Sequence, residues 1–177
     1  RWFYMDSGLM VTKVNGNSTS TFGGDVDVTG NVITDAPTFH AYNNANQSVS
    51  SATWTKVQLN TKEWDTSNDF DTSNYRYTPT VAGYYQVNMN LRFSNSGSFS
   101  QVLIATYKNG SQYRVTTNLR DIVSVSPMHV VGSLLVYLNG ATDYIEFYAN
   151  IAATSPIFAY ATTENSCWME ATLARAV

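Results

Sequence analysis

The chain has 177 residues, a net charge of −3 and one cysteine, and only 13% of its residues are charged. It has no cluster of Lys and Arg with which to neutralise phosphates, which argues against nucleic acid as a partner. A lone cysteine cannot form an intrachain disulfide, so a disulfide-stapled mini-protein is excluded as well. No stretch approaches the roughly 20 apolar residues of a transmembrane helix, and we expect no membrane insertion.

The first 36 residues differ from the rest of the chain. Apolar residues are sparse there, turn pairs such as Asn15-Gly16 recur, and residues 25–29 alternate around two valines. A single ribbon with one valine face cannot bury that face alone, whereas three chains wound together could. We therefore expect a trimeric β shaft over residues 1–36, with a polar N-terminal arm as the alternative. The chain opens abruptly on RWFYMDSG, and we expect it to be a piece of a longer protein.

Strand and turn signals alternate from residue 37 to the end, and no helix of 10 or more residues is indicated. Strands are expected at eight places: residues 38–42, 53–59, 83–93, 102–108, 112–117, 130–138, 144–150 and 168–177. Two Asn-Gly pairs, at 109–110 and 139–140, are hairpin signals. Seven or more strands with regular turns predict an all-β sandwich or jelly roll over residues 37–177.

A spaced set of residues carries the most specific signal in the chain. It runs in the order apolar residue, acid, aromatic, aromatic, glycine and tyrosine: Leu59, Asp65, Phe70, Tyr77, Gly83 and Tyr85. The spacing resembles the signature of the C1q family. The residue types agree at Asp65, Phe70, Gly83 and Tyr85, and they stay apolar or aromatic at the other two positions. The resemblance covers roughly residues 37–177 and implies a C1q-like jelly-roll head that forms a homotrimer.

The same six residues are expected to build the core of the fold and not to contact a ligand. Aromatic side chains suit a thick sandwich core, and their hydroxyls need partners there. A glycine before a tyrosine-rich strand lets the backbone pack where a side chain would collide. The C1q family builds heads that bind partners and do no chemistry, so the resemblance also implies a protein without enzymatic activity.

A search for catalytic groups gives no positive feature. His40 and His129 fall on separate expected strands, and no nucleophile elbow, metal-binding His pair or phosphate loop is present. Cys167 is interpreted as a buried small hydrophobe and not as a nucleophile. We therefore expect no catalytic residue.

One acidic cluster remains as a candidate metal site. Three carboxylates lie close together in the sequence, at Asp65, Asp69 and Asp71. Oxygen ligands in a loop suit Ca²⁺, and some C1q-like trimers carry calcium. The alternative is a solvated acidic loop, because the spacing of an EF-hand is absent. Apart from this calcium site, no cofactor is expected.

The alternation of strand direction predicts which loops share an end of the fold, and therefore where a partner would bind. If strands alternate up and down and the last returns to the end where the chain enters, the two Asn-Gly turns lie at that base. The longer loops 94–100, 118–128 and 151–164 then share the far tip, and exposed loops on a rigid scaffold favour binding. Six residues of these loops are candidate receptor contacts: Phe99, Arg120, Asp121, Ile157, Phe158 and Tyr160. The alternative for Phe158 and Tyr160 is burial at the start of a strand.

Three functional hypotheses follow. Residues 22–32, FGGDVDVTGNV, resemble the shaft segments of phage tail and head fibres. This favours an extracellular virion fibre with a C1q-like head that binds a host surface receptor, either glycan or protein. Its other partners would be fibre, capsid or tail subunits upstream. The alternatives are a structural trimerisation knob without receptor binding and a secreted C1q-like ligand of a cell, although the collagen stalk usual in cellular members is absent.

Overall fold

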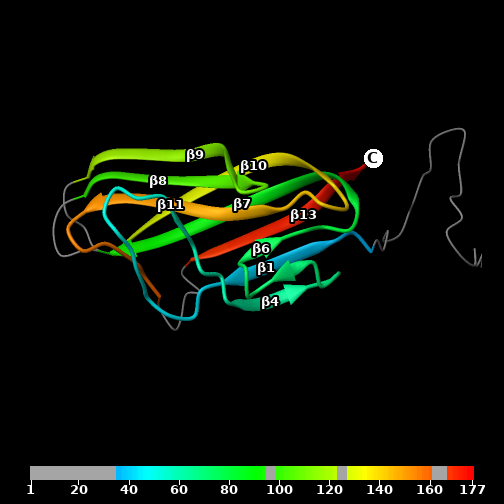
Figure 1. Cartoon of the computed structure of the whole chain (residues 1–177), viewed down its shortest axis with the longest axis horizontal. Helices are drawn as coiled ribbons and strands as arrows, with labels where there is room; N and C mark the ends of the chain where they lie inside the picture. Colours follow the sequence, from blue (N-terminus) through cyan, green and yellow to red (C-terminus); the bar gives the residue numbers. More distant parts are fainter. Residues whose placement is uncertain (1–34, 95–98, 123–126, 161–166) are drawn as a thin grey trace, which may run out of the picture. The chain divides into compact units, whose positions relative to one another are not determined.

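The structure, a computed structural model, describes residues 35–94, 99–122, 127–160 and 167–177 (Figure 1). The chain divides into two units, residues 1–34 and 35–177, and the described residues all belong to the second. The β shaft expected over residues 1–36 thus lies, up to residue 34, outside the described residues. All regular elements in the described part are strands, and it contains no helix long and apolar enough to cross a membrane.

The first of two antiparallel sheets contains seven strands. Five follow one another by pairing: β10 (Met128–Asn139), β7 (Ala82–Ser94), β13 (Trp168–Ala176), β1 (Thr38–Tyr42) and β4 (Thr61–Asp65). Two short strands complete the sheet, of which β12 (Ile157–Phe158) pairs with the end of β7 and β2 (Gln47–Ser48) pairs with β12.

The second sheet contains six strands. Its pairing order is β5 (Phe70–Asp71), β6 (Arg76–Tyr77), β11 (Ile145–Ala153), β8 (Phe99–Lys108) and β9 (Ser111–Ile122). Strand β3 (Thr55–Lys56) pairs with β11 further along that strand. Figure 1 shows β11, β8 and β9 side by side.

The hydrophobic core lies between the two sheets because the long strands alternate between apolar and polar residues. In β7, Tyr85, Val87, Met89, Leu91 and Phe93 are all buried, as period-2 alternation predicts. The facing layer comes from the second sheet, where the inward residues of β8 and β11 are apolar and buried in the same cluster. The observed sandwich confirms the predicted all-β class.

Most of the expected strands are present, and β1 has the predicted bounds. The long strand expected over residues 53–59 is wrong, because only β3 is a strand there. Beyond β3 the chain keeps an irregular course: the N–H of Val57 donates to the carbonyl of Phe147, and the N–H of Leu59 bonds back to Val57. Strand β4 and the short strands β2, β5, β6 and β12 were not predicted.

The two Asn-Gly pairs behave differently. Asn109 and Gly110 both have positive φ, 53° and 76°, as a two-residue hairpin between β8 and β9 requires. The hairpin expected at 139–140 is wrong, since β10 pairs with β7 and β11 pairs with β8. The Asn139 side-chain oxygen accepts the N–H groups of the three residues from 141 to 143, which makes a longer connection between the sheets.

The ends of the sandwich follow the predicted loop parity. At one end, Asn109 donates to Asp143, the N–H of Val177 donates to Ala82, and the N–H of Leu173 donates to Pro37. This end therefore gathers both Asn-Gly turns, the start of the described chain and the C-terminus (Figure 1). The opposite end pairs residue 94 with 157 and residue 99 with 122, so the described ends of the three longer loops lie together there.

Candidate functional site

The signature residues form one aromatic layer of the core. Phe39 stacks on Phe70 with ring centroids 4.9 Å apart and on Tyr77 at 4.3 Å. Leu59, Tyr77 and Tyr85 are fully buried, and Phe70 nearly so. These positions therefore hold the fold together and offer nothing to a ligand, as the sequence predicts.

Asp65, the remaining polar member of the signature, fastens the acidic loop. Its buried carboxylate accepts the backbone N–H groups of Asp69 and Phe70 at 3.1 and 3.0 Å. The ammonium group of Lys62 donates to the same carboxylate at 3.0 Å. Asp65 thus anchors the loop that leads into β5.

The other two carboxylates of the loop also accept hydrogen bonds from protein donors. Asp69 accepts the N–H and the hydroxyl of Thr80, and its burial raises the pKa of its carboxyl above the ordinary value. Asp71 accepts the side-chain amide of Asn74 and the N–H groups of Ser73 and Asn74, and these bonds lower the pKa of its carboxyl. Asp71 is therefore satisfied by donors from its own turn, and Asp69 by Thr80, which follows β6.

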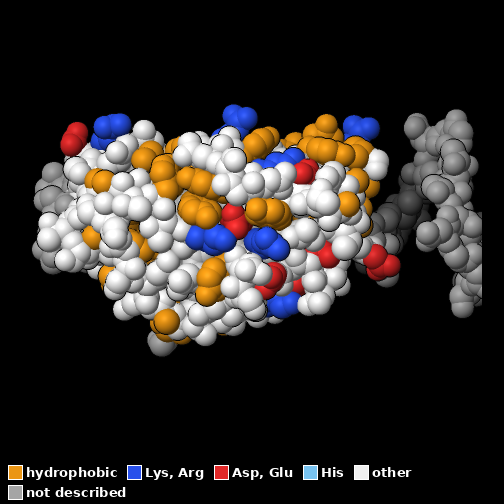
Figure 2. Space-filling view, viewed as in Figure 1, with side chains coloured by type: hydrophobic (Ala, Val, Ile, Leu, Met, Phe, Trp, Pro, Cys, Tyr) orange, Lys and Arg blue, Asp and Glu red, His pale blue; other side chains and the backbone are white. Residues whose placement is uncertain are grey.

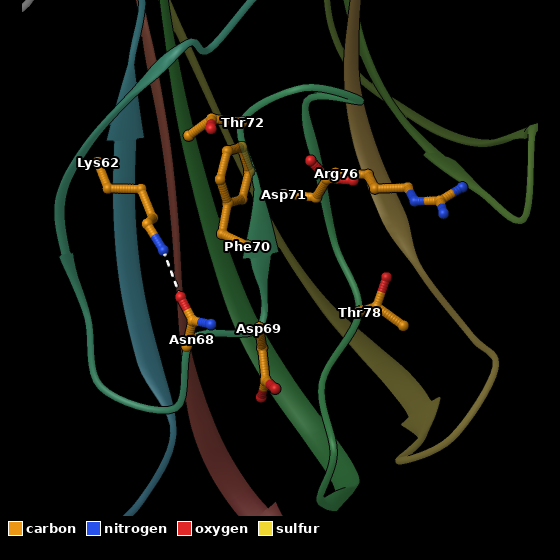
Figure 3. Close-up of a pocket in the computed structure, with 8 residues that line it drawn as sticks. All are labelled: Lys62, Asn68, Asp69, Phe70, Asp71, Thr72, Arg76 and Thr78. Carbon is orange, nitrogen blue, oxygen red and sulfur yellow. Dashed lines mark hydrogen bonds between the residues drawn. The ribbon is translucent and has the colours of Figure 1, made fainter.

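A hollow of about 500 Å³ lies beside this loop (Figure 3). Asp69 and Asp71 line it together with two cations, Lys62 and Arg76. Figure 3 shows the ammonium group of Lys62 pointing to Asn68, to which it donates at 2.8 Å. Among the residues that the structure describes, no three of the types His, Cys, Asp and Glu are placed to hold a metal ion. The calcium site expected at Asp65, Asp69 and Asp71 stays a prediction, and in the described structure protein donors already bond to each of these carboxylates.

The candidate tip contacts divide into buried and accessible residues. Phe99 and Phe158 are buried core residues, and Phe99 packs edge to face on Phe93 at 4.8 Å. They are corrections to the expected contact set, because each ends its loop by entering a strand. Arg120 and Asp121 are exposed, whereas Ile157 and Tyr160 are half-buried. Residues 95–98, 123–126 and 161–166 of these loops lie outside the described residues.

The side chains considered for catalysis stay apart. His40 is buried on β1, stacks on Trp64 at 4.8 Å and lies 3.3 Å from Glu63, while His129 lies on β10 and contacts Asn90. Burial raises the pKa of the Cys167 thiol to about 12. The thiol therefore stays protonated at neutral pH, and neither histidine is recorded in contact with it.

No family model matches the chain. Solved structures do match its described sandwich. The globular domain of zebrafish complement 1qA shares 15% identity, covering 80% of this chain and 99% of that one, with a TM-score of 0.53. The Eiger TNF of S. frugiperda covers 80% and 93% at 10% identity with a TM-score of 0.56, and murine APRIL at pH 5.0 covers 78% and 98% at 10% identity with 0.55. The chain has the C1q/TNF jelly-roll fold.

One curated protein is similar in sequence. The phage-like element PBSX protein XkdV of Bacillus subtilis is 28% identical over 116 residues, which is 62% of this chain. The chain spans only 17% of the length of XkdV. The sequence similarity therefore concerns a small part of a much longer protein.

The outer face of the first sheet of the C1q/TNF-like domain exposes large apolar side chains. Val131 and Leu135 are 67% and 53% exposed on β10, and Tyr137 packs there against Tyr84 of β7. β10 is also an edge strand, since β7 is its partner in the described sheet. No sequence-based prediction identified this surface. The signal was the alternation in β10, which turns every second residue from 131 to 137 outward.

Proposed function

We propose that this chain is the trimeric, non-enzymatic head of a virion fibre and that it attaches the virion to a host cell surface. The observation that carries the proposal is a C1q/TNF jelly roll in a chain similar to a phage-element protein. A recognition role also fits the site geometry, in which histidines and the buried thiol are dispersed and the acidic loop is internally satisfied.

Trimer formation is supported by the exposed face of the first sheet. Val131, Leu135, Tyr84 and Tyr137 form an apolar surface next to an edge strand of 12 residues. An exposed apolar surface is an aggregation hazard unless another chain covers it. The open side of β10 itself already meets β9, whose Thr117 hydroxyl donates to the carbonyl of Val131. A ring of three copies covers this apolar surface in every subunit by one repeated contact.

The tip opposite the termini is the proposed receptor-contact surface. Arg120 and Asp121 are exposed at the end of β9, and Tyr160 follows β12, which pairs with the end of β7. Asp121 is held with φ of 51°, an uncommon conformation outside glycine and one often found at functional loops. Arg and Tyr are frequent anchors in interfaces.

Two measurements test the proposal on the 177-residue chain. Sedimentation should give three copies, and the fluorescently labelled protein should adhere to whole bacterial cells of a panel that includes Bacillus subtilis. The double variant Arg120→Ala/Asp121→Ala should stay trimeric and lose adhesion. Thr142→Ala, an exposed change at the opposite end of the sandwich, is the matched control and should keep adhesion.

Each negative result would contradict a different part of the proposal. A monomer would overturn the trimer. Adhesion that survives the double variant would overturn the tip as the contact surface. A trimer that adheres to no cell of the panel would instead support a structural trimerisation knob, for which the long apolar edge of β10 is the favouring observation.

A further inference from the structure

A second hollow, of about 320 Å³, opens on the side of the second sheet. This volume falls at the small end of ligand pockets. Its lining is almost wholly of amide and hydroxyl side chains: Gln47, Thr55, Gln58, Ser73, Asn74 and Tyr75. The segments that supply them are far apart in the sequence and meet only in the fold. Such a lining suits a ligand that carries many hydroxyl groups.

Lys56 also lines this hollow and connects it to a row of aromatic side chains. Tyr148 and Tyr107 are stacked with centroids 3.9 Å apart, and Trp54 tilts against Tyr107 at 6.0 Å. The ammonium group of Lys56 lies 5.9 Å from the centroid of the Tyr148 ring. Figure 2 shows hydrophobic, basic and acidic side chains intermingled over β11 and β6. A polar hollow thus continues into a half-exposed aromatic surface.

The charges around the hollow compensate one another. Lys56 donates to Glu146 at 2.5 Å, and the guanidinium of Arg76 lies 4.7 Å from the Tyr144 ring and close enough to Asp71 to help lower the pKa of that carboxyl. Two cations and two carboxylates leave no net charge to attract a polyanion. The Glu146 side chain is only 5% exposed, and its second oxygen is buried without a hydrogen-bond partner among the described residues.

Tyr75 gives an independent indication that the hollow is used. Its backbone has φ of 55°, which is an outlier for a bulky side chain. Glycine or asparagine would occupy this turn position at lower energetic cost. The half-buried side chain makes no hydrogen bond or ring contact within the described residues, and it lines the hollow. Such costly backbone conformations gather at functional sites.

We propose that this hollow and the adjoining aromatic row bind neutral sugar residues of a surface polysaccharide. Sugar rings combine hydroxyls, which the amide of Gln58 and the hydroxyls of Ser73 and Tyr75 can bond, with apolar C–H faces that pack on aromatic rings. The side chains of Gln47, Thr55 and Asn74 already bond to Lys56, Thr53 and Asp71 and shape the wall of the hollow.

The inference goes beyond the proposed function because it concerns the flank of the domain and not its tip. The two sheets of a sandwich expose opposite outer faces. The hollow lies between β2 of the first sheet and β3 and the β5–β6 turn of the second, whereas the proposed trimer contact is on β10 and β7. Sugar binding would therefore persist in the trimer and would not depend on Arg120 or Asp121.

Affinity electrophoresis tests the proposal with the 177-residue protein in native gels that contain dextran, mannan, laminarin or galactan. Polygalacturonate is the acidic comparison. At least one neutral polysaccharide should retard the protein, with little dependence on salt. Gln58→Ala and Tyr75→Gly should each weaken this retardation about tenfold, a loss of roughly 1.4 kcal/mol of binding free energy. Tyr113→Ala, which removes an exposed tyrosine of β9, is the matched control and should migrate as the wild type does.

Three outcomes would overturn the inference: no retardation by any neutral polysaccharide, retardation that survives both variants, or salt-sensitive retardation by polygalacturonate alone. Tyr75→Gly should fold, because glycine accepts the backbone conformation of residue 75. Cell adhesion of the same variants separates the two proposals. Sugar binding without any cell adhesion contradicts only the proposed function, and tip-dependent adhesion without sugar binding contradicts only the flank site.

Discussion

The rings of Tyr77 and Tyr85 meet edge to face in the core with centroids 5.8 Å apart, yet only one of the two hydroxyls is satisfied. The hydroxyl of Tyr85 donates to the carbonyl of Val81 at 2.8 Å. The hydroxyl of Tyr77 is buried and makes no hydrogen bond of ordinary geometry within the described residues, although it lies close enough to the Tyr85 hydroxyl for each to affect the pKa of the other. Burial raises the pKa of both hydroxyls, that of Tyr85 to about 12. Both tyrosines therefore stay neutral over the ordinary pH range.

Removing each hydroxyl in turn should have opposite consequences. Tyr85→Phe should lower the free energy of unfolding by about 1 kcal/mol, because the Val81 carbonyl loses its bond to the hydroxyl. Tyr77→Phe should leave this free energy unchanged or raise it, since an unsatisfied buried group is removed. Urea titration followed by circular dichroism measures both. Tyr84→Phe, on the exposed face of the same strand, is the control, and a larger loss for Tyr77→Phe than for Tyr85→Phe would contradict the assignment.

Gly83 should tolerate no side chain. A Cβ atom at this position would lie 2.4 Å from the carbonyl oxygen of Arg175 and 2.6 Å from a methyl group of Leu173. Because Arg175 contributes backbone, Gly83→Ala must push β13 away from β7. We expect a loss of about 1–3 kcal/mol in the free energy of unfolding, measured by urea titration. A change below about 0.5 kcal/mol would show that the two strands are not packed as described.

His40 should make stability depend on pH. Burial lowers the pKa of its imidazole below 6.5, although the carboxylates of Glu63 and Glu170 act in the opposite direction, and the rings of Trp64 and Trp168 cover it. The unfolded chain then takes up the proton at a higher pH than the folded chain does. The stabilisation is therefore complete above 6.5 and is lost as the pH falls through the folded pKa.

The variant His40→Phe keeps a ring on Trp64 and removes the proton-binding group. Its melting temperature should fall less than that of the wild type between about pH 7 and pH 5. His129→Phe removes the other histidine of the chain and should keep the wild-type pH dependence. Parallel pH profiles for wild type and His40→Phe would exclude His40 as the source.

The sequence predicted the long strands because their periodicity is local. In β7 and β10 the apolar residues recur at every second position, so a single strand reports its own buried face. The two-residue strands β2, β3 and β5 have no such pattern. They exist because a neighbouring strand offers hydrogen-bonding groups, and that information lies elsewhere in the chain.

The candidate site was harder to predict for the same reason. Phe99 follows a Ser- and Gly-rich stretch and was expected in a loop, but it is the first residue of β8 and enters the core. The hollow around Tyr75 joins segments near residues 47, 56 and 74, which no local spacing connects. Carboxylate spacing suggested calcium at Asp65 because the sequence does not show which backbone amides and lysine will reach each carboxylate.

Asp65 should act through these bonds and not through a metal. Asp65→Ala removes the acceptor of the N–H groups of Asp69 and Phe70 and the partner of Lys62, all beside a buried side chain. We expect a loss of about 2–3 kcal/mol in the free energy of unfolding. Asp71→Ala, in the exposed turn of the same loop, should cost less. Thermal melts with calcium chloride or with EDTA should coincide for the wild type, since protein donors already satisfy the three carboxylates. A melting temperature that rises with calcium, and does so no longer in Asp65→Ala, would contradict this account and restore a metal-binding role to the acidic loop.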